Sequence, residues 1–221
     1  MDRRGLHGLY VITNRRSAAE PWRVEQALRG GARIVQYRDK TDDPQRRLHE
    51  ACRLRAMCRA AGTLFIVNDD VDLAAASGAD GVHLGSSDTD LASARRALGA
   101  DAIIGISCYN ELERAERAAT EGADYVAFGS FFPSPTKPGA VRATPELLEQ
   151  ARLVLDIPVA AIGGIDAGNA ASLVAAGADM LAVISAVFER EDIQASARRL
   201  TDAIESAAGH GAGTSPNGTT R

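Results

Sequence analysis

Short apolar runs alternate with longer amphipathic stretches along almost the whole chain. The apolar runs are four to five residues long, rich in Val and Ile, and mostly continuous instead of alternating with polar residues. Strands that are buried on both faces of a parallel sheet show this pattern. The sequence therefore predicts eight buried strands, at residues 9–13, 34–37, 64–67, 81–84, 103–107, 125–128, 159–162 and 181–184.

The stretches between these runs have the spacing of amphipathic helices. A Gly-Ala phrase closes four of them and opens the next apolar run, at Gly31, Gly78, Gly122 and Gly177. Glycine at such a point suits the C-terminal cap of a helix, and Asp43 and Thr144 suit N-caps. Helices are predicted at 20–30, 44–61, 70–77, 88–98, 110–121, 144–155, 167–176 and 192–206.

Strict alternation of strand and helix favours a parallel sheet, either closed as a barrel or open and doubly wound. Eight units in 221 residues, with no break in composition, favour closure. We therefore expect an α/β fold, a single (β/α)₈ TIM barrel spanning residues 1–207. The Gly/Ser/Thr-rich segment 208–221 is expected to be a disordered tail.

Charge and composition exclude several classes of protein. The net charge is −4 with both signs interspersed, which argues against a general nucleic-acid binder. The apolar run near the N-terminus is too short for a signal peptide, and no stretch of about 18 apolar residues predicts a membrane span. The three cysteines form no CxxC pair. We expect a cytoplasmic protein that binds small phosphorylated molecules, and the sequence leaves a homo-oligomer open.

Polar residues follow the predicted strands, at the end where catalytic groups of barrels lie. Gln36, Arg38 and Lys40 lie on one side of the second strand, because side chains alternate along a strand. Two cations and an amide at one strand end suit a polyanion. A solvated run of charges at the surface is the alternative interpretation.

Carboxylates follow the next two strands. Asn68, Asp69 and Asp70 end the third strand, and Asp88 lies beyond the fourth. One carboxylate from each loop, Asp69 and Asp88, suits Mg²⁺, which prefers oxygen ligands and takes few from the protein. The alternative is that Asp88 is a helix N-cap, and Asp70 and Asp72 could likewise cap the helix after the third strand. His83 is expected to be a core histidine bonded to a neighbour.

A second anion site is predicted after the last two strands. Gly163 and Gly164 follow the seventh strand and Ser185 follows the eighth, where backbone N–H groups of barrels often bind phosphate. The long Pro-rich loop 131–142 adds Ser134, Thr136 and Lys137, and Ser107 closes the fifth strand. Together the strand ends predict one strongly cationic site that uses a metal and one site of neutral backbone, as for a pyrophosphate and a monophosphate.

Seven segments, in this order and spacing, resemble the thiamine-phosphate synthase family from Leu9 to about Leu200. They are QYRDK (36–40), VNDD (67–70), HLGSSD (83–88), GIS (105–107), FPSPTK (132–137), IPVAAIGGI (157–165) and GADMLAVISAVF (177–188). The resemblance implies a transferase of thiamine biosynthesis. It would join 4-amino-2-methyl-5-(diphosphooxymethyl)pyrimidine to a carboxylated or plain thiazole phosphate, releasing pyrophosphate by a Mg²⁺-assisted dissociative step.

The resemblance also implies a role for each matching residue. The pyrophosphate would be held by Arg38, Lys40, Asn68, Ser107 and Lys137, of which Arg38, Lys40, Ser107 and Lys137 would be catalytic. Mg²⁺ would be bound by Asp69 and Asp88, and the pyrimidine by Gln36. The thiazole partner would face Ser134 and Thr136, and its phosphate would lie on Gly164, Ile184 and Ser185.

The chain departs from the family at two positions, with Ser86 in place of a common Gln and Ser134 in place of a common Thr. Three other functions remain open. A thiazole tautomerase of the same superfamily typically has His where this chain has Ser130. A sugar-phosphate isomerase or epimerase would not need Lys137 or two metal carboxylates. A non-catalytic phosphate-ligand barrel would need no leaving-group chemistry.

Overall fold

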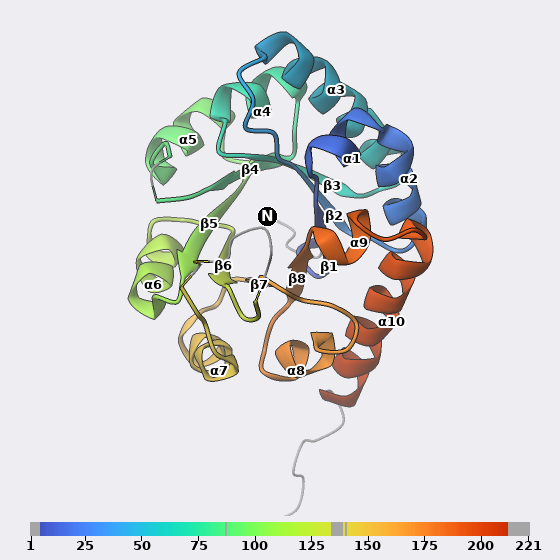
Figure 1. Ribbon diagram of the computed structural model, residues 1–221. Coiled ribbons are helices and arrows are strands. Elements are labelled where there is room, and N and C mark those ends of the chain that lie inside the picture. Colours follow the sequence, from blue (N-terminus) through green and yellow to red (C-terminus); the bar gives the residue numbers. More distant parts are fainter. Residues whose placement is uncertain (1–4, 87, 134–138, 140, 212–221) are drawn as a thin grey trace, which may run out of the picture.

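The structure, a computed structural model, describes residues 5–86, 88–133, 139 and 141–211. Its eight strands pair in parallel in chain order, and β8 pairs with β1, so the sheet closes into a barrel ringed by helices (Figure 1). The strands are β1 Gly8–Ile12, β2 Ile34–Tyr37, β3 Leu64–Asn68, β4 Gly81–Leu84, β5 Ile103–Tyr109, β6 Tyr125–Gly129, β7 Val159–Ile162 and β8 Met180–Val183. The predicted (β/α)₈ barrel is confirmed, and the doubly wound alternative is wrong.

The helices largely follow the predicted amphipathic stretches. They are α1 Arg15–Ala19, α2 Pro21–Arg29, α3 Pro44–Ala60, α4 Val71–Ser77, α5 Leu91–Leu98, α6 Leu112–Thr120, α7 Pro145–Val154, α8 Ala170–Ala175, α9 Ser185–Phe188 and α10 Ile193–Gly211. The short helices α1 and α9 were not predicted, because neither is long enough to show a helical period. A capping box between Asn14 and Ser17 starts α1.

The last helix is longer than expected. It runs to Gly211, so residues 208–211 are helical and the expected boundary at 207 lies within α10. The sequence between Glu205 and Ala208 contains no proline and two alanines, which favour continuation of a helix. Residues 212–221, the rest of the expected tail, lie outside the described residues.

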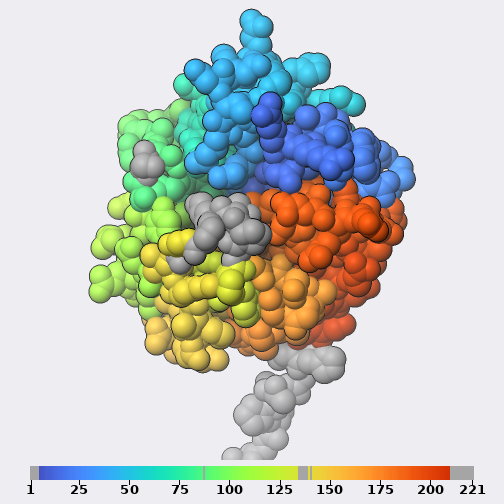
Figure 2. All heavy atoms as spheres, viewed as in Figure 1, coloured from blue at the N-terminus to red at the C-terminus, as the bar shows by residue number. Residues whose placement is uncertain are grey.

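Two apolar layers hold the barrel together. Along β6, Tyr125 and Ala127 pack inside the barrel, whereas Val126 and Phe128 pack between the strands and the helices. This alternation follows from the pleat of a strand. Side chains in both layers are buried, which explains the continuous apolar runs in the sequence. Seen as spheres from the same side, blue N-terminal segments adjoin orange-red C-terminal segments (Figure 2), because β1 pairs with β8 and α10 packs on α2.

The described part of the chain contains no helix that is both long and apolar enough to cross a membrane. All three cysteines are free thiols. Burial raises the pKa of Cys58 and of Cys108 to about 12, so neither is an activated nucleophile.

Gly105 lies inside the barrel beneath the ring of Tyr125. A Cβ atom added at Gly105 would lie 2.0 Å from Cζ of Tyr125. We expect Gly105→Ala to lower the free energy of unfolding by about 1–3 kcal/mol, measured by urea denaturation, because a packed core accommodates extra volume poorly. Gly209→Ala is the matched control, since nothing lies within 4 Å of its added Cβ. Equal effects of the two substitutions would contradict this explanation of Gly105.

Candidate active site

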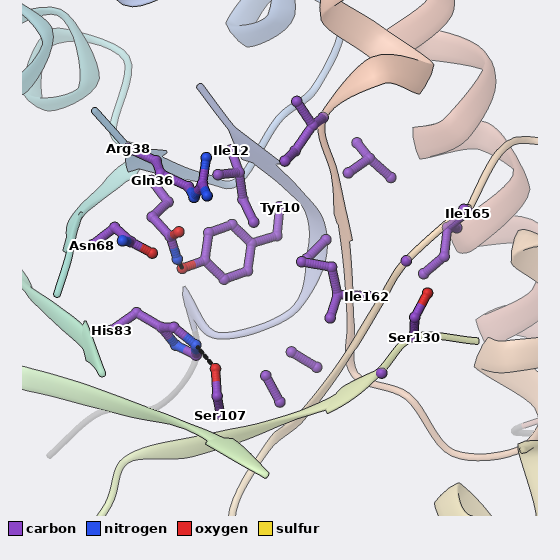
Figure 3. Close-up of a pocket in the computed structure, with 18 of the residues that line it drawn as sticks. Tyr10, Ile12, Gln36, Arg38, Asn68, His83, Ser107, Ser130, Ile162 and Ile165 are labelled. Carbon is purple, nitrogen blue, oxygen red and sulfur yellow. Dashed lines mark hydrogen bonds between the residues drawn. The ribbon is translucent and has the colours of Figure 1, made fainter. Parts of the chain in front are cut away.

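A cavity of about 390 Å³ opens at the carboxyl ends of the strands (Figure 3). Its inner walls are largely apolar, with Ile12, Ala160 and Ile162 among them. Seven of the predicted site residues line it, namely Gln36, Arg38, Asn68, Ser107, Gly164, Ile184 and Ser185. Strands distant in sequence therefore deliver these groups to one cavity, as the family resemblance implied.

A more open groove of about 610 Å³ adjoins the cavity, and Asn68 lines both. Lys40 and Asp69 line the groove, and Nζ of Lys40 lies 3.3 Å from Oδ2 of Asp69. The site thus has an apolar interior and a charged edge. This combination fits a flat ring with a charged group attached.

Asp69 and Asp88 bring two carboxylates together at the charged edge. Asp69 has a left-handed backbone (φ 66°) directly after β3, and its N–H donates to the carbonyl oxygen of His83 at 2.8 Å. Oδ2 of Asp88 accepts a hydrogen bond of 2.6 Å from the N–H of Gly85. Burial raises the pKa of Asp88, and the carboxylate of Asp69 raises it further, against the Gly85 hydrogen bond. A carboxylate whose ionisation is disfavoured by a second carboxylate beside it suits a cation shared by the two.

The alternative role as a helix cap is confirmed for Asp70, whereas Asp90 and not Asp88 caps the helix after β4. Asp70 caps α4 by accepting from the N–H of Leu73, and Asp90 caps α5 by accepting from the N–H of Ser93. The helix predicted from residue 88 consequently begins at Leu91. Within the described residues, no group of three or more His, Cys, Asp and Glu side chains is placed to hold a metal, so a cation here would depend on substrate oxygens.

The loop that carries the cations is anchored from behind by Asp39. The Asp39 side chain is 1% exposed and lies 2.9 Å from Nη1 of Arg46, a residue of α3 that also contacts Glu50 at 3.0 Å. On the other side, the N–H of Arg38 donates to Oγ1 of Thr13 at 2.9 Å. The neighbours of Asp39 therefore face the mouth of the barrel while Asp39 itself faces α3.

Loss of this anchor should weaken substrate binding. Burial by itself would raise the pKa of Asp39, but hydrogen bonds from Thr41 and Arg46 outweigh it and lower the pKa below the ordinary value. We expect Asp39→Asn to lower the free energy of unfolding by about 1–2 kcal/mol and to raise the Kd for inorganic pyrophosphate severalfold. The control is Asp42→Asn, an exposed carboxylate in the same loop.

The lowered pKa of Asp39 also determines how the loss of unfolding free energy in Asp39→Asn depends on pH. The ionised Asp39 stabilises the fold above its unfolded pKa of about 4, and this contribution is lost as the pH falls through the lower folded value. The difference in unfolding free energy between Asp39→Asn and the unmodified chain should therefore shrink below about pH 4. A difference that stays constant through this range would refute the assignment.

His83 is a buried histidine bonded to neighbours, as predicted. Its Nδ1 lies 2.9 Å from the hydroxyl of Tyr125, and its Nε2 lies 2.9 Å from Oγ of Ser107. Tyr125 also contacts Tyr10, whose hydroxyl accepts from the amide nitrogen of Gln36 at 2.7 Å. The sequence analysis did not identify the two tyrosines. The signal that could have identified them was a tyrosine, whose ring carries a hydroxyl group, at an inward-facing position of β1 and of β6.

Tyr109 and Ser86 form part of the rim of the site. Tyr109 has a left-handed backbone (φ 54°) at an irregularity in the pairing of β5 with β6. Its hydroxyl lies 3.0 Å from Oγ of Ser86, the residue that replaces the common Gln of the family. The shorter Ser86 side chain thus contacts an aromatic ring that lines the cavity.

Glycines after β7 bring backbone close to the cavity. Gly164 has a φ of 65°, and a Cβ added there would lie 2.5 Å from the carbonyl oxygen of Pro133. Ser185 begins α9 directly after β8, so the first N–H groups of that helix point away from its body. The two segments supply uncharged backbone, in contrast to the charged edge around Lys40.

Three predicted residues, Ser134, Thr136 and Lys137, lie outside the described residues. The segments on either side are described and lie at the cavity. The N–H of Phe132 donates to the carbonyl oxygen of Gly163 at 2.9 Å, and the N–H of Ser130 donates to that of Val141 at 2.9 Å.

The sequence and the fold match known proteins closely. A family model described as thiamine monophosphate synthase matches residues 9–187. A thiamine-phosphate synthase of Thioalkalivibrio sulfidiphilus is 57% identical over 203 residues, covering 90% of this chain and 96% of the relative. One from Halorhodospira halophila is 54% identical over 195 residues, covering 88% and 93%.

A solved structure agrees with these relatives. The thiamine phosphate pyrophosphorylase from Pyrococcus furiosus superposes with a TM-score of 0.85 at 39% identity, covering 93% of this chain and 98% of that chain. The resemblance that rested on seven short segments is therefore confirmed over most of the chain. The chain belongs to the thiamine monophosphate synthase family, and like its relatives it is a transferase of thiamine biosynthesis.

Proposed function

We propose that the barrel transfers the pyrimidinylmethyl group of 4-amino-2-methyl-5-(diphosphooxymethyl)pyrimidine to the ring nitrogen of a thiazole phosphate, carboxylated or plain. The observation that carries the proposal is the meeting of an apolar cavity with a charged edge on one side and glycine-rich backbone on the other. The pyrimidine ring would occupy the cavity next to Gln36. Its diphosphate would extend to Arg38, Lys40, Asn68 and Ser107.

The thiazole phosphate would lie on the opposite side of the cavity. The backbone at Gly164, Ile184 and Ser185 would hold its phosphate through N–H groups. Ser134, Thr136 and Lys137, which belong to the loop after β6, would complete the site. Roles for these three residues rest on the family resemblance alone.

Asp69 and Asp88 would bind Mg²⁺, because paired carboxylates at the charged edge fit an ion that takes one or two carboxylates and substrate phosphates as ligands. When bound, the ion would supply positive charge to the pyrophosphate. Lys40, at 3.3 Å from Asp69, would balance the pair in its absence.

The reaction would be a dissociative displacement. The bond between the methylene carbon and the diphosphate oxygen breaks, and pyrophosphate takes the electron pair. The thiazole nitrogen then donates its lone pair to the methylene carbon, and a carboxylated thiazole loses CO₂ in addition. Such a step needs stabilisation of the leaving group and exclusion of water, and not a strong base.

The residues of this chain suit both needs. Arg38 and Lys40 would neutralise charge on the leaving pyrophosphate, and Ser107 would donate a hydrogen bond to it. The apolar walls, including Ile12 and Ile162, would leave little room for water near the methylene cation. Competing hydrolysis of that cation would thereby be suppressed.

The tautomerase alternative is disfavoured by the residue at the end of β6. Ser130 occupies that position, and its hydroxyl donates to the carbonyl oxygen of Phe132 at 2.8 Å. It thus stabilises the start of the loop and lacks the imidazole that proton transfer in a tautomerase would use.

The direct test is to incubate the protein with both phosphorylated precursors, with and without Mg²⁺, and to measure thiamine phosphate by chromatography. We expect product and pyrophosphate in equal amounts when Mg²⁺ is present, and a large loss of rate with EDTA. Parallel reactions with the carboxylated and the plain thiazole measure the preference between them. Absence of product in the presence of Mg²⁺ would refute the proposed reaction.

A further inference from the structure

Five side chains from five strands form a continuous hydrogen-bonded chain across the interior of the barrel. The links run from Gln36 Nε2 to Tyr10 Oη (2.7 Å), Tyr10 Oη to Tyr125 Oη (2.9 Å), Tyr125 Oη to His83 Nδ1 (2.9 Å) and His83 Nε2 to Ser107 Oγ (2.9 Å). Figure 3 shows Gln36 beside Tyr10 at one end and the bond between His83 and Ser107 at the other. Both ends line the cavity.

The middle of this chain is buried. Tyr10 is 2% exposed and Tyr125 is fully buried, with its ring stacked on His83 at a centroid distance of 5.5 Å. Burial raises the pKa of both tyrosines well above the ordinary value, so both keep their hydroxyl hydrogens. Each buried hydroxyl must therefore donate to a neighbour, because an unsatisfied donor in such a place is costly.

The amide at one end determines the direction of every link. The amide nitrogen of Gln36 donates and has no free lone pair, so the Tyr10 hydroxyl must donate to Tyr125. The Tyr125 hydroxyl accepts the hydrogen bond from Tyr10 and donates its own hydrogen to Nδ1 of His83. With Nδ1 as acceptor, the neutral imidazole carries its hydrogen on Nε2 and donates it to Ser107.

We infer that Tyr10, Tyr125 and His83 act as positioning residues that fix the hydrogen-bonding direction of the two groups at the ends of the chain. Gln36 is left with its carbonyl oxygen as an acceptor, which suits an amino group on a substrate ring. Ser107, which accepts from His83, is left with its hydroxyl hydrogen as a donor, which suits an oxygen of a leaving diphosphate. These two ligand assignments rest on the proposed function, whereas the direction of the chain does not.

The direction can be tested without substrate. Long-range ¹H–¹⁵N correlation spectra of protein labelled with ¹⁵N-histidine distinguish the two neutral tautomers, and the four histidines of the chain keep the spectrum simple. The His83 signal is assigned by its loss in His83→Gln. We expect His83 to carry its hydrogen on Nε2. Finding it on Nδ1 would reverse every link and overturn the inference, whatever reaction the protein catalyses.

The coupling to Ser107 is tested by a double-mutant cycle. Tyr125→Phe removes the central hydroxyl and should lower kcat about tenfold, because Ser107 is then free to turn its hydrogen away from the substrate. In a Ser107→Ala background the same substitution should change kcat less than twofold. Additive effects in the two backgrounds would show that Tyr125 acts through packing alone and would overturn the inference.

Two further variants separate positioning from stability. Tyr10→Phe removes the hydroxyl that accepts from the Gln36 amide, so it should raise KM for the pyrimidine substrate more than it lowers kcat. Tyr125→Phe should instead affect kcat more than KM. Thr201→Val is the matched control, since it removes a buried hydroxyl that donates to Gly30 outside the cavity lining. It should leave kcat and KM unchanged while lowering the stability. The same kcat and KM losses in Thr201→Val would count against positioning.

Discussion

Replacing Arg38 with alanine should lower kcat/KM for the pyrimidine diphosphate by about 10²–10³, the usual loss when one group that stabilises developing charge is removed. Arg38 lines the cavity at the end of β2. Its backbone N–H donates to Oγ1 of Thr13, which fixes the point from which the Arg38 side chain extends. In the proposed reaction, charge would build on the diphosphate as the bond to carbon breaks, so most of the loss should fall on kcat. Steady-state kinetics with the diphosphate varied measures the split.

Controls define what the Arg38 result means. Arg29→Ala removes an exposed arginine of α2 that pairs with Glu25, and it should be nearly silent. Arg38→Lys keeps the positive charge but loses the planar guanidinium that can donate two parallel hydrogen bonds, so it should be more active than Arg38→Ala and less active than the unmodified chain. Near-normal turnover in Arg38→Ala would remove this residue from the leaving-group role and leave the diphosphate to other cations.

Substitution of Asp88 by asparagine should raise the Mg²⁺ concentration needed for half-maximal activity about a hundredfold. The reason is that one of the two carboxylates proposed to bind Mg²⁺ is lost. Activity measured over a Mg²⁺ titration gives this value, and high Mg²⁺ should restore part of the rate. The control is Asp90→Asn, which removes a carboxylate two residues away that caps α5.

The same substitution makes an independent prediction for the metal-free protein. The pKa of Asp88 is raised, so its ionised form is disfavoured in the folded state and Asp88 lowers stability at neutral pH. Asp88→Asn should therefore raise the Tm in EDTA at pH 7, and this gain should shrink as the pH falls toward the ordinary carboxyl pKa. A Tm below that of the unmodified chain would mean that Asp88 does not lie against another carboxylate.

Local pattern was enough to predict the strands and the groups at their ends. Val and Ile runs identify strands buried on both faces, and alternation in a strand places Gln36 and Arg38 on one side. Closure of the barrel then brings Asn68 and Ser107 to the same cavity without further information. The positions of these residues at the cavity were thus predictable from the sequence, although their chemical roles are still proposals.

Contacts across the barrel were not predictable in this way. Tyr10 and Tyr125 are 115 residues apart, and nothing in the pattern around either one specifies that their hydroxyls meet. The sequence also left Asp88 open as a helix N-cap, whereas Asp90 is the cap, because both precede the same amphipathic stretch and only the backbone turn distinguishes them. Local sequence predicts which face a side chain takes, but not its partner from another strand.

Pairing between β1 and β8 has a consequence for how the protein folds during its synthesis. The first strand leaves the ribosome early, yet its partner between Met180 and Val183 emerges only after most of the chain has been made. Until then the ring is open, and the edge of β1 must stay unpaired or be shielded. Tyr10 lies on β1 and Ser185 lies two residues beyond β8, so the cavity that both of them line cannot be complete before nearly all of the barrel has been synthesised.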